Sequence, residues 1–221
     1  MDVLALFLKT PQSGNAKRRL RSVLSEGEVV RLCEAFAGDL LEKLLAFPCH
    51  QKIVAYAGPV PQGLLDLQNL PPFSLYAQAA GDLGERLEDY FRWNFLQGAT
   101  KSIVIGSDSP TLPSRYLEEA FHLLDRKEVV LGPSEDGGYY LIGLRCFLPL
   151  LFHGIPWGTE RVFEETMKRV DPSEVGVLER WYDVDTPSDL KRLRDHLNQM
   201  AKDPADSIPS RTQRVLSELT F

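Results

Sequence analysis

The stretch Ile103-Val104-Ile105-Gly106-Ser107-Asp108-Ser109-Pro110 begins with a short β-branched run and then breaks at a glycine and a proline. The run predicts a buried strand, so Asp108 lies just beyond its carboxyl end. Ligands of open α/β sheets bind at that edge, where a carboxylate, with Ser107 beside it, suits a divalent cation held against phosphate oxygens. The alternative is that Asp108 only caps the next helix, since Asp and Ser are common capping residues.

Apolar runs of strand length alternate with segments of helical periodicity along most of the chain. Besides the run at Ile103, we expect strands at 3–8, 52–57, 73–78, 128–132, 139–144 and 178–185, and helices near 25–44, 81–96, 113–124, 159–170 and 186–201. This alternation predicts an α/β fold, a single-domain Rossmann-like α/β/α sandwich with a mostly parallel central sheet. We assign residues 1–203 to this domain. We expect residues 204–221 to be a polar C-terminal tail, which either contains one peripheral helix near 211–219 or frays.

The composition is that of a globular protein without a membrane segment. Of 221 residues, 43% are hydrophobic and 25% are charged, and no apolar run approaches the roughly 20 residues that cross a bilayer. The run at 3–8 is too short for a signal peptide. Three well-separated cysteines indicate a reducing compartment, so we expect a cytoplasmic protein. The net charge of −6 argues against general binding of nucleic acid.

A local excess of positive charge interrupts this acidic chain. Between residues 9 and 21 there are five cations and no acid. The segment follows the first strand, the usual phosphate position in such folds, but its spacing matches neither a P-loop nor the dinucleotide GxGxxG pattern. We therefore expect Lys9, Lys17 and Arg19 to hold phosphates, with help from backbone amides near Gly14. The alternative is a solvated basic loop.

A second candidate anion site is the segment Gln78-Ala-Ala-Gly-Asp-Leu-Gly-Glu-Arg86. Gly81 and Gly84 flank the start of a predicted helix, whose backbone amides could approach an anion or a base edge. Arg86 lies in the first turns of the same helix. The alternative is a plain turn followed by a helix start that the glycines weaken.

The segment Gly132-Pro-Ser-Glu-Asp-Gly-Gly-Tyr-Tyr140 lies between two apolar strands. Asp136-Gly137 is a strong hairpin signal, which explains those two residues without any function. It does not explain Glu135 or Gly138. Neighbouring carboxylates beside glycines suit an acceptor pocket or a base that orients a hydroxyl, so Glu135 and Asp136 are the catalytic candidates here.

Two further motifs, Trp157-Gly-Thr159 and Asp183-Val-Asp185, follow later in the chain. Residues two apart on an extended strand point to the same side, so Asp183 and Asp185 could both face the pocket. With Asp108, one of them would complete a carboxylate cage for Mg²⁺ or Mn²⁺, and Asp185 is the candidate. The alternative makes Asp185 part of a helix cap. The remaining residues that we assign to the acceptor pocket or its loops are Gly137, Gly138, Trp157, Thr159 and Asp183.

Taken in order, these motifs resemble the DUF2064 family, whose members are also called arsenosugar-biosynthesis-type or radical-SAM/selenodomain-associated transferases. The resemblance extends from Val3 to about Leu193. It rests on the Lys-Pro loop after the first strand and on Lys17-x-Arg19-Leu20, Gly81-Asp-Leu-Gly-Glu-Arg86, Gly106-Ser-Asp-Ser-Pro110, Glu135-Asp-Gly-Gly-Tyr139, Trp157-x-Thr159 and Asp183-Val-Asp185-Thr-Pro. One departure is Arg18, where the family usually has threonine.

The family is placed in the nucleotide-diphospho-sugar transferase superfamily, so the resemblance implies a GT-A-like fold. It also implies a nucleotide at the carboxyl edge of a Rossmann-like sheet. In this comparison Asp108 is the counterpart of the metal-binding aspartate of GT-A enzymes. Lys9, Lys17 and Arg19 are then expected near the diphosphate.

The leading hypothesis is a metal-dependent transferase with Mg²⁺ or Mn²⁺ that uses a nucleotide-activated donor, in the first place a glycosyltransferase using an NDP-sugar. The second is a nucleotidyltransferase of the guanylyltransferase kind, which releases pyrophosphate from an NTP and holds a small phosphorylated acceptor with Arg18 or Arg86. The third is a nucleotide-binding module without catalysis. The expected partners are a nucleotide donor and a small-molecule acceptor, with neither nucleic acid nor membrane. A homodimer is compatible with the sequence, which leaves the oligomeric state open.

Overall fold

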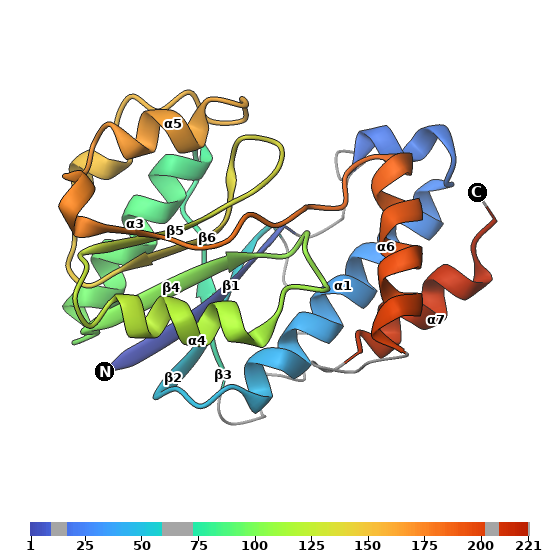
Figure 1. Ribbon diagram of the computed structural model, residues 1–221, viewed down its shortest axis with the longest axis horizontal. Coiled ribbons are helices and arrows are strands. Elements are labelled where there is room, and N and C mark those ends of the chain that lie inside the picture. Colours follow the sequence, from blue (N-terminus) through green and yellow to red (C-terminus); the bar gives the residue numbers. More distant parts are fainter. Residues whose placement is uncertain (10–16, 59–72, 202–207, 221) are drawn as a thin grey trace.

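The computed structural model describes residues 1–9, 17–58, 73–201 and 208–220. Its centre is one seven-stranded sheet with the order β3-β2-β1-β4-β6-β5-β7 (Figure 1). The strands are β1 (Asp2–Lys9), β2 (Gln51–Ala57), β3 (Phe73–Ala77), β4 (Lys101–Gly106), β5 (Val129–Pro133), β6 (Tyr139–Leu144) and β7 (Val175–Val177). The central strands β1 and β4 are buried on both faces, as their continuous apolar runs predict.

The sheet is mostly parallel. Strand β1 pairs in parallel with β2 and β4, β2 with β3, and β5 with β7, whereas β6 is antiparallel to both β4 and β5. The β5–β6 hairpin turns at Asp136-Gly137, where Gly137 has a φ of 89° and Ser134 N donates to Gly138 O at 3.0 Å. The predicted α/β class with a mostly parallel sheet is therefore confirmed.

Helices cover both faces of the sheet, as an α/β/α sandwich requires. The helices are α1 (Glu26–Ala46), α3 (Leu83–Leu96), α4 (Ser114–Leu123), α5 (Val162–Met167), α6 (Pro187–Met200) and α7 (Ser210–Glu218), with 3-10 turns η1 (Arg18–Ser22), η3 (Pro149–Leu151) and η4 (Pro172–Glu174). Helices α1 and α4 pack on one face through Leu44 and Leu117. Helices α3 and α5 pack on the other through Leu87 and Phe163.

The strand expected at 178–185 is not formed. Strand β7 is short and lies just before it, and the following residues make a single isolated bridge between Ser134 and Trp181. Instead, this segment leaves the sheet edge and crosses to the loop after β4, where Val184 N donates to Asp108 O at 3.0 Å. The backbone donors that a strand would use are thus partly engaged with the loops of the candidate site.

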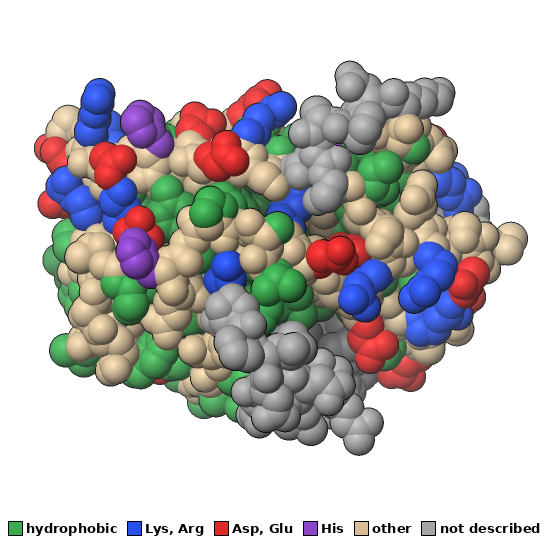
Figure 2. Space-filling view, turned by 90° about the horizontal axis from the view of Figure 1, so that it is seen from below, with side chains coloured by type: hydrophobic (Ala, Val, Ile, Leu, Met, Phe, Trp, Pro, Cys, Tyr) green, Lys and Arg blue, Asp and Glu red, His purple; other side chains and the backbone are tan. Residues whose placement is uncertain are grey.

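Charged side chains are mixed over the surface that Figure 2 displays. On that face, blue and red side chains of the described residues lie next to one another without a broad patch of one sign (Figure 2). In the same described part of the chain, no helix combines the length and the apolar character needed to span a bilayer.

Beside the sheet, α6 and α7 pack with α1 around a separate apolar cluster that includes Leu32, Leu193 and Leu216 (Figure 1). Helix α7 is attached to α1 through Asp39, which is only 6% exposed. The Asp39 carboxylate accepts hydrogen bonds from Arg211 N at 3.0 Å and Thr212 N at 2.8 Å. Of the two alternatives for the end of the chain, a helix is therefore observed. A buried carboxylate satisfies the free amides at its start.

We predict that Asp39→Ala lowers the free energy of unfolding by about 2 kcal/mol, because two amides at the start of α7 lose their charged acceptor. A thermal melt should show a decrease of roughly 5 °C for a chain of this size. Glu42→Ala, at an exposed position on α1, the helix that carries Asp39, is the matched control and should melt as the wild type does. Equal melting temperatures for Asp39→Ala and the wild type would contradict this account of α7.

Candidate functional site

A buried lysine joins three segments at the carboxyl edge of the sheet. Lys17 immediately precedes η1, has a left-handed backbone (φ 43°), and its side chain is 5% exposed. Its ammonium donates to Val184 O at 2.7 Å and to Asp185 Oδ1 at 3.0 Å, and it also forms an ion pair with the carboxylate of Asp108. The structure thus brings together Lys17, Asp108 and Asp185, three of the residues predicted from the sequence. We call them the Lys17 cluster.

Charge balance leaves the Lys17 cluster negative. Burial by itself would lower the pKa of Lys17, but the neighbouring Asp108 and Asp185 carboxylates raise it above its usual value, so the ammonium stays charged at neutral pH. The two carboxylate side chains are 50% and 45% exposed, respectively. One cation between two ionised carboxylates leaves a net charge of about −1 facing solvent. Such a cluster attracts a further cation and repels an isolated anion.

Asp183 lies next to this cluster but does not share its solvent exposure. Ser109 Oγ donates to Asp183 Oδ1 at 2.5 Å and to Tyr182 O at 3.1 Å. Burial, together with the charges of Asp108 and other acids nearby, raises the pKa of Asp183 to about 7. Asp185 contacts the lysine, while Asp183 is bonded to the loop after β4.

The two carboxylates of the hairpin have partners already. Glu135 forms a two-pronged ion pair with Arg192 of α6, in which Nη2 donates to Oε1 at 2.9 Å. This contact lowers the pKa of Glu135, so the carboxylate is ionised at neutral pH. Asp136 accepts from Gly138 N at 3.0 Å and from Ser134 Oγ. Asp136 and Gly138 therefore stabilise the turn of the hairpin through these hydrogen bonds.

Sequence reasoning missed Arg192. It lies 57 positions after its partner Glu135, and its guanidinium carbon is 4.1 Å from the centroid of the Tyr182 ring. On α6 it reads as one of several charged residues of an exposed helix face, so the local pattern contains no signal for the pair.

The glycines of the Gln78–Arg86 segment have local structural explanations. Gly81 has a φ of 111°, and a Cβ on Gly84 would collide with the Trp157 indole, which packs directly on the helix backbone. The first amides of α3 are capped by Asp82 and Glu85, and Arg86 Nε donates to Gly81 O at 3.0 Å. The start of α3 is thus already occupied by carboxylates of the chain itself.

The other predicted site residues are spread around the same edge or beyond it. Ser107 is half-buried where β4 ends, and Arg19 is exposed on η1. Gly137 supports the β5–β6 turn under the backbone of Glu160, and Thr159 Oγ1 donates to Pro156 O at 2.8 Å within its own turn. The Lys9 side chain and Gly14 lie outside the described residues.

The family model described as "Uncharacterized protein conserved in bacteria (DUF2064)" matches residues 40–159. The match contains Asp108 and the β5–β6 hairpin, whereas Lys17 and Asp185 lie outside it. A search among curated proteins found no match.

Solved structures share the fold of the whole chain. One from Desulfovibrio desulfuricans G20, named "putative nucleotide-diphospho-sugar transferase", is 28% identical over 98% of this chain and 97% of that one, with a TM-score of 0.84. A cytidylyltransferase from Leptospira borgpetersenii serovar Hardjo-bovis is 15% identical over 100% and 98%, with a TM-score of 0.53. A CMP:2-keto-3-deoxy-manno-octonic acid synthetase complexed with CTP is 13% identical over 90% and 98%, with a TM-score of 0.52. The last two comparisons establish only a common fold.

We predict that Asp183→Asn becomes increasingly stable relative to the wild type as the pH rises from 4 to 8. The folded pKa of about 7 exceeds the ordinary value of 3.8, so the ionisation of Asp183 destabilises the wild type as pH rises through this interval. A pKa difference of one corresponds to about 1.4 kcal/mol, and asparagine can still accept the Ser109 hydrogen bond. Urea unfolding in the presence of a chelator measures the difference at each pH.

Glu118→Gln, at an exposed position on α4, is the control for this series. Its stability relative to the wild type should change little with pH. A difference between Asp183→Asn and the wild type that stays constant from pH 4 to 8 would show that the buried carboxyl titrates normally.

Proposed function

The chain belongs to the DUF2064 family, and we propose that it is a transferase acting on a nucleotide-activated donor, in the first place a glycosyltransferase that uses an NDP-sugar. The observation that carries this proposal is the Lys17 cluster, a buried ammonium between two half-exposed carboxylates at the carboxyl edge of β1 and β4. Open α/β sheets bind their ligands at this edge. The similarity to the D. desulfuricans protein, which is named "putative nucleotide-diphospho-sugar transferase", supports the same assignment.

The chemistry of the cluster fits a divalent cation that arrives with a nucleotide. The described residues contain no group of three or more His, Cys, Asp or Glu side chains arranged to hold a metal ion unaided. Mg²⁺ is commonly held by one or two carboxylates, with phosphate oxygens and waters completing its octahedron, and Asp108 and Asp185 match that donor set. When bound, the metal would stabilise negative charge on the departing diphosphate.

In this proposal the charge of the cluster makes nucleotide binding depend on metal. A diphosphate approaching Asp108 and Asp185 meets a net negative group, so it binds well only with a cation that offsets the carboxylates. The Lys17 ammonium can then donate hydrogen bonds to phosphate oxygens as well as to the carboxylates of the cluster. Arg19 is exposed on the turn that follows Lys17, and we keep it as a candidate for binding phosphate.

The proposed transfer joins an acceptor hydroxyl oxygen to the anomeric carbon of the donor sugar. The bond between that carbon and the diphosphate oxygen breaks, and its electron pair leaves with the nucleoside diphosphate. We assign Glu135 to the acceptor: its ionised carboxylate accepts a hydrogen bond from the hydroxyl and takes its proton as the new bond forms. Arg192 holds this carboxylate in position.

Nucleotidyl transfer is the second candidate, because the fold is shared with cytidylyltransferases. In that reaction the acceptor oxygen bonds to the α-phosphorus of an NTP, and the bond to the β-phosphate oxygen breaks with release of pyrophosphate. The two reactions differ in donor and product, so product analysis separates them. A module that only binds nucleotide is the third candidate and requires no metal.

We predict that one nucleoside diphosphate, among GDP, UDP, CDP and ADP, raises the melting temperature in the presence of Mn²⁺ and not in its absence. A ligand at one hundred times its Kd stabilises the folded state by about 2.7 kcal/mol. Asp108→Asn should lose most of this gain, because one of the two carboxylates for the cation is gone. Without ligand the variant should stay folded, since Asp108 is half exposed and Lys17 keeps Asp185 and the Val184 carbonyl.

Glu42→Gln, at an exposed position on α1, serves as the charge-matched control and should respond as the wild type does. Equal stabilisation of Asp108→Asn and the wild type would remove Asp108 from the site. Stabilisation that is independent of metal would favour the third candidate, and a preference for an NTP would favour the second.

A further inference from the structure

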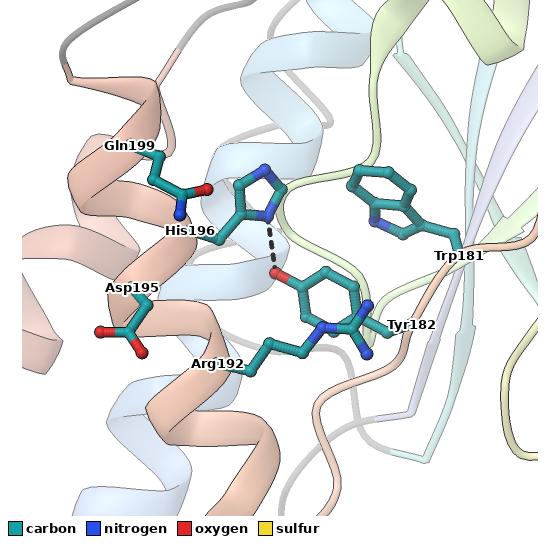
Figure 3. Close-up of a pocket in the computed structure, with 6 residues that line it drawn as sticks. All are labelled: Trp181, Tyr182, Arg192, Asp195, His196 and Gln199. Atoms are coloured by element: carbon teal, nitrogen blue, oxygen red, sulfur yellow. Dashed lines mark hydrogen bonds between the residues drawn. The ribbon is translucent and has the colours of Figure 1, made fainter.

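A pocket of about 510 Å³ lies between α6 and the segment that leads from β7 toward the Lys17 cluster (Figure 3). This volume falls within the roughly 300–1,000 Å³ of ordinary small-ligand sites. The pocket is lined by Trp181, Tyr182, Arg192, Asp195, His196 and Gln199. Nothing in the family assignment or the sequence motifs draws attention to these residues, apart from their proximity to Asp183.

Hydrogen bonds connect the pocket wall directly to the proposed acceptor carboxylate and to the loop that carries Asp108. Arg192 lines the pocket and holds Glu135, and Glu135 N in turn donates to Trp181 O at 3.0 Å. Thr111, in the loop that carries Asp108, donates from its Oγ1 to the hydroxyl of Tyr182 in the pocket wall at 3.0 Å. A ligand in the pocket would therefore lie beside Glu135.

The pocket lining has no excess of positive charge. Arg192 is paired with Glu135, and Asp195 adds a negative charge from α6. Burial, followed by the charge of Arg192, lowers the pKa of His196, so its ring is neutral at pH 7. An acceptor phosphate would find no cation here whose charge is not already offset, and so the pocket favours an uncharged ligand.

The polar groups of the pocket alternate between donors and acceptors. Thr111 donates to the Tyr182 oxygen, so the Tyr182 O–H donates to His196 Nδ1 at 2.9 Å, and His196 is then left with a donor at Nε2. Asp195 offers an acceptor and Gln199 offers both kinds of group. In Figure 3 the Gln199 amide extends toward the His196 ring, and the Tyr182 ring lies on the opposite side of that histidine ring.

Hydroxyl groups are the natural partners of such a lining, because each can donate and accept one hydrogen bond. The Trp181 indole, which is half-buried, supplies an apolar wall against which the C–H face of a ring can lie. We propose that this pocket is the acceptor subsite and binds a neutral polyhydroxylated ring, such as a sugar or a cyclitol. The inference rests on the proposed transferase function and specifies the class of its acceptor.

The test uses the indole N–H signals in ¹H–¹⁵N spectra of the full chain, which has three tryptophans. Trp181→Phe identifies the Trp181 signal, and Trp93, which lies on α3, serves as the internal reference. The probes are D-glucose, D-galactose, D-mannose and myo-inositol, each compared with its monophosphate. We expect at least one neutral probe to shift the Trp181 signal in a saturable manner, with the Trp93 signal unchanged, and its phosphate to bind more weakly.

Gln199→Ala and Asn198→Ala form a matched pair, because both remove an exposed amide from α6 but only Gln199 lines the pocket. Gln199→Ala should weaken binding roughly five-fold, the loss expected for one hydrogen bond, and Asn198→Ala should not. Tighter binding of a phosphorylated probe, equal effects of the two variants, or no Trp181 shift with any probe would overturn the proposal. Metal-dependent nucleotide stabilisation is measured on the same sample, so a failed acceptor subsite is distinguishable from a failed transferase assignment.

Discussion

A charged ammonium withdrawn from water must be matched by nearby carboxylates or carbonyls, and this constraint organises the functional edge of the molecule. Lys17 has three such partners: the carboxylate of Asp108 from the loop after β4, and the Val184 carbonyl and the Asp185 carboxylate from the segment before α6. Three parts of the chain that are distant in sequence are thereby held together. The left-handed backbone at Lys17 is strained for a residue other than glycine, which indicates that the surrounding contacts are strong enough to impose it.

The same arrangement gives a physical reason for the proposed use of metal. In the structure the Lys17 ammonium neutralises one of the two carboxylate charges and leaves the other facing solvent. A divalent cation offsets the two negative charges on the diphosphate of an NDP-sugar, with the cation placed against the carboxylates and Lys17 near the phosphates in our proposal. In our proposal the donor meets the Lys17 cluster and the acceptor meets the pocket on α6, so donor and acceptor would be recognised by different chemistry.

Much of the fold could be predicted from the sequence because each strand of a parallel sheet is a local apolar run, and Asp108 was placed correctly by the glycine that ends β4. The segment 178–185 was wrongly predicted to be a strand, because its alternating pattern does not reveal that it leaves β5 after Trp181 and that Val184 N bonds to the loop after β4. Gly84 has a cause in the indole of Trp157, more than seventy positions away, which no local pattern contains. The Arg192–Glu135 pair and the His196–Tyr182 hydrogen bond escaped prediction for the same reason, since charged and aromatic residues on an exposed helix have no distinctive spacing.

The most direct test of the central claim is the anomalous scattering of Mn²⁺ in crystals of the protein grown with the nucleoside diphosphate that stabilises it most. Our account predicts a peak bonded to carboxylate oxygens of Asp108 and Asp185 and to phosphate oxygens, with the Lys17 ammonium on the diphosphate. A nucleotide bound elsewhere, or a Mn²⁺ peak away from these two carboxylates while Lys17 still bridges them, would contradict it.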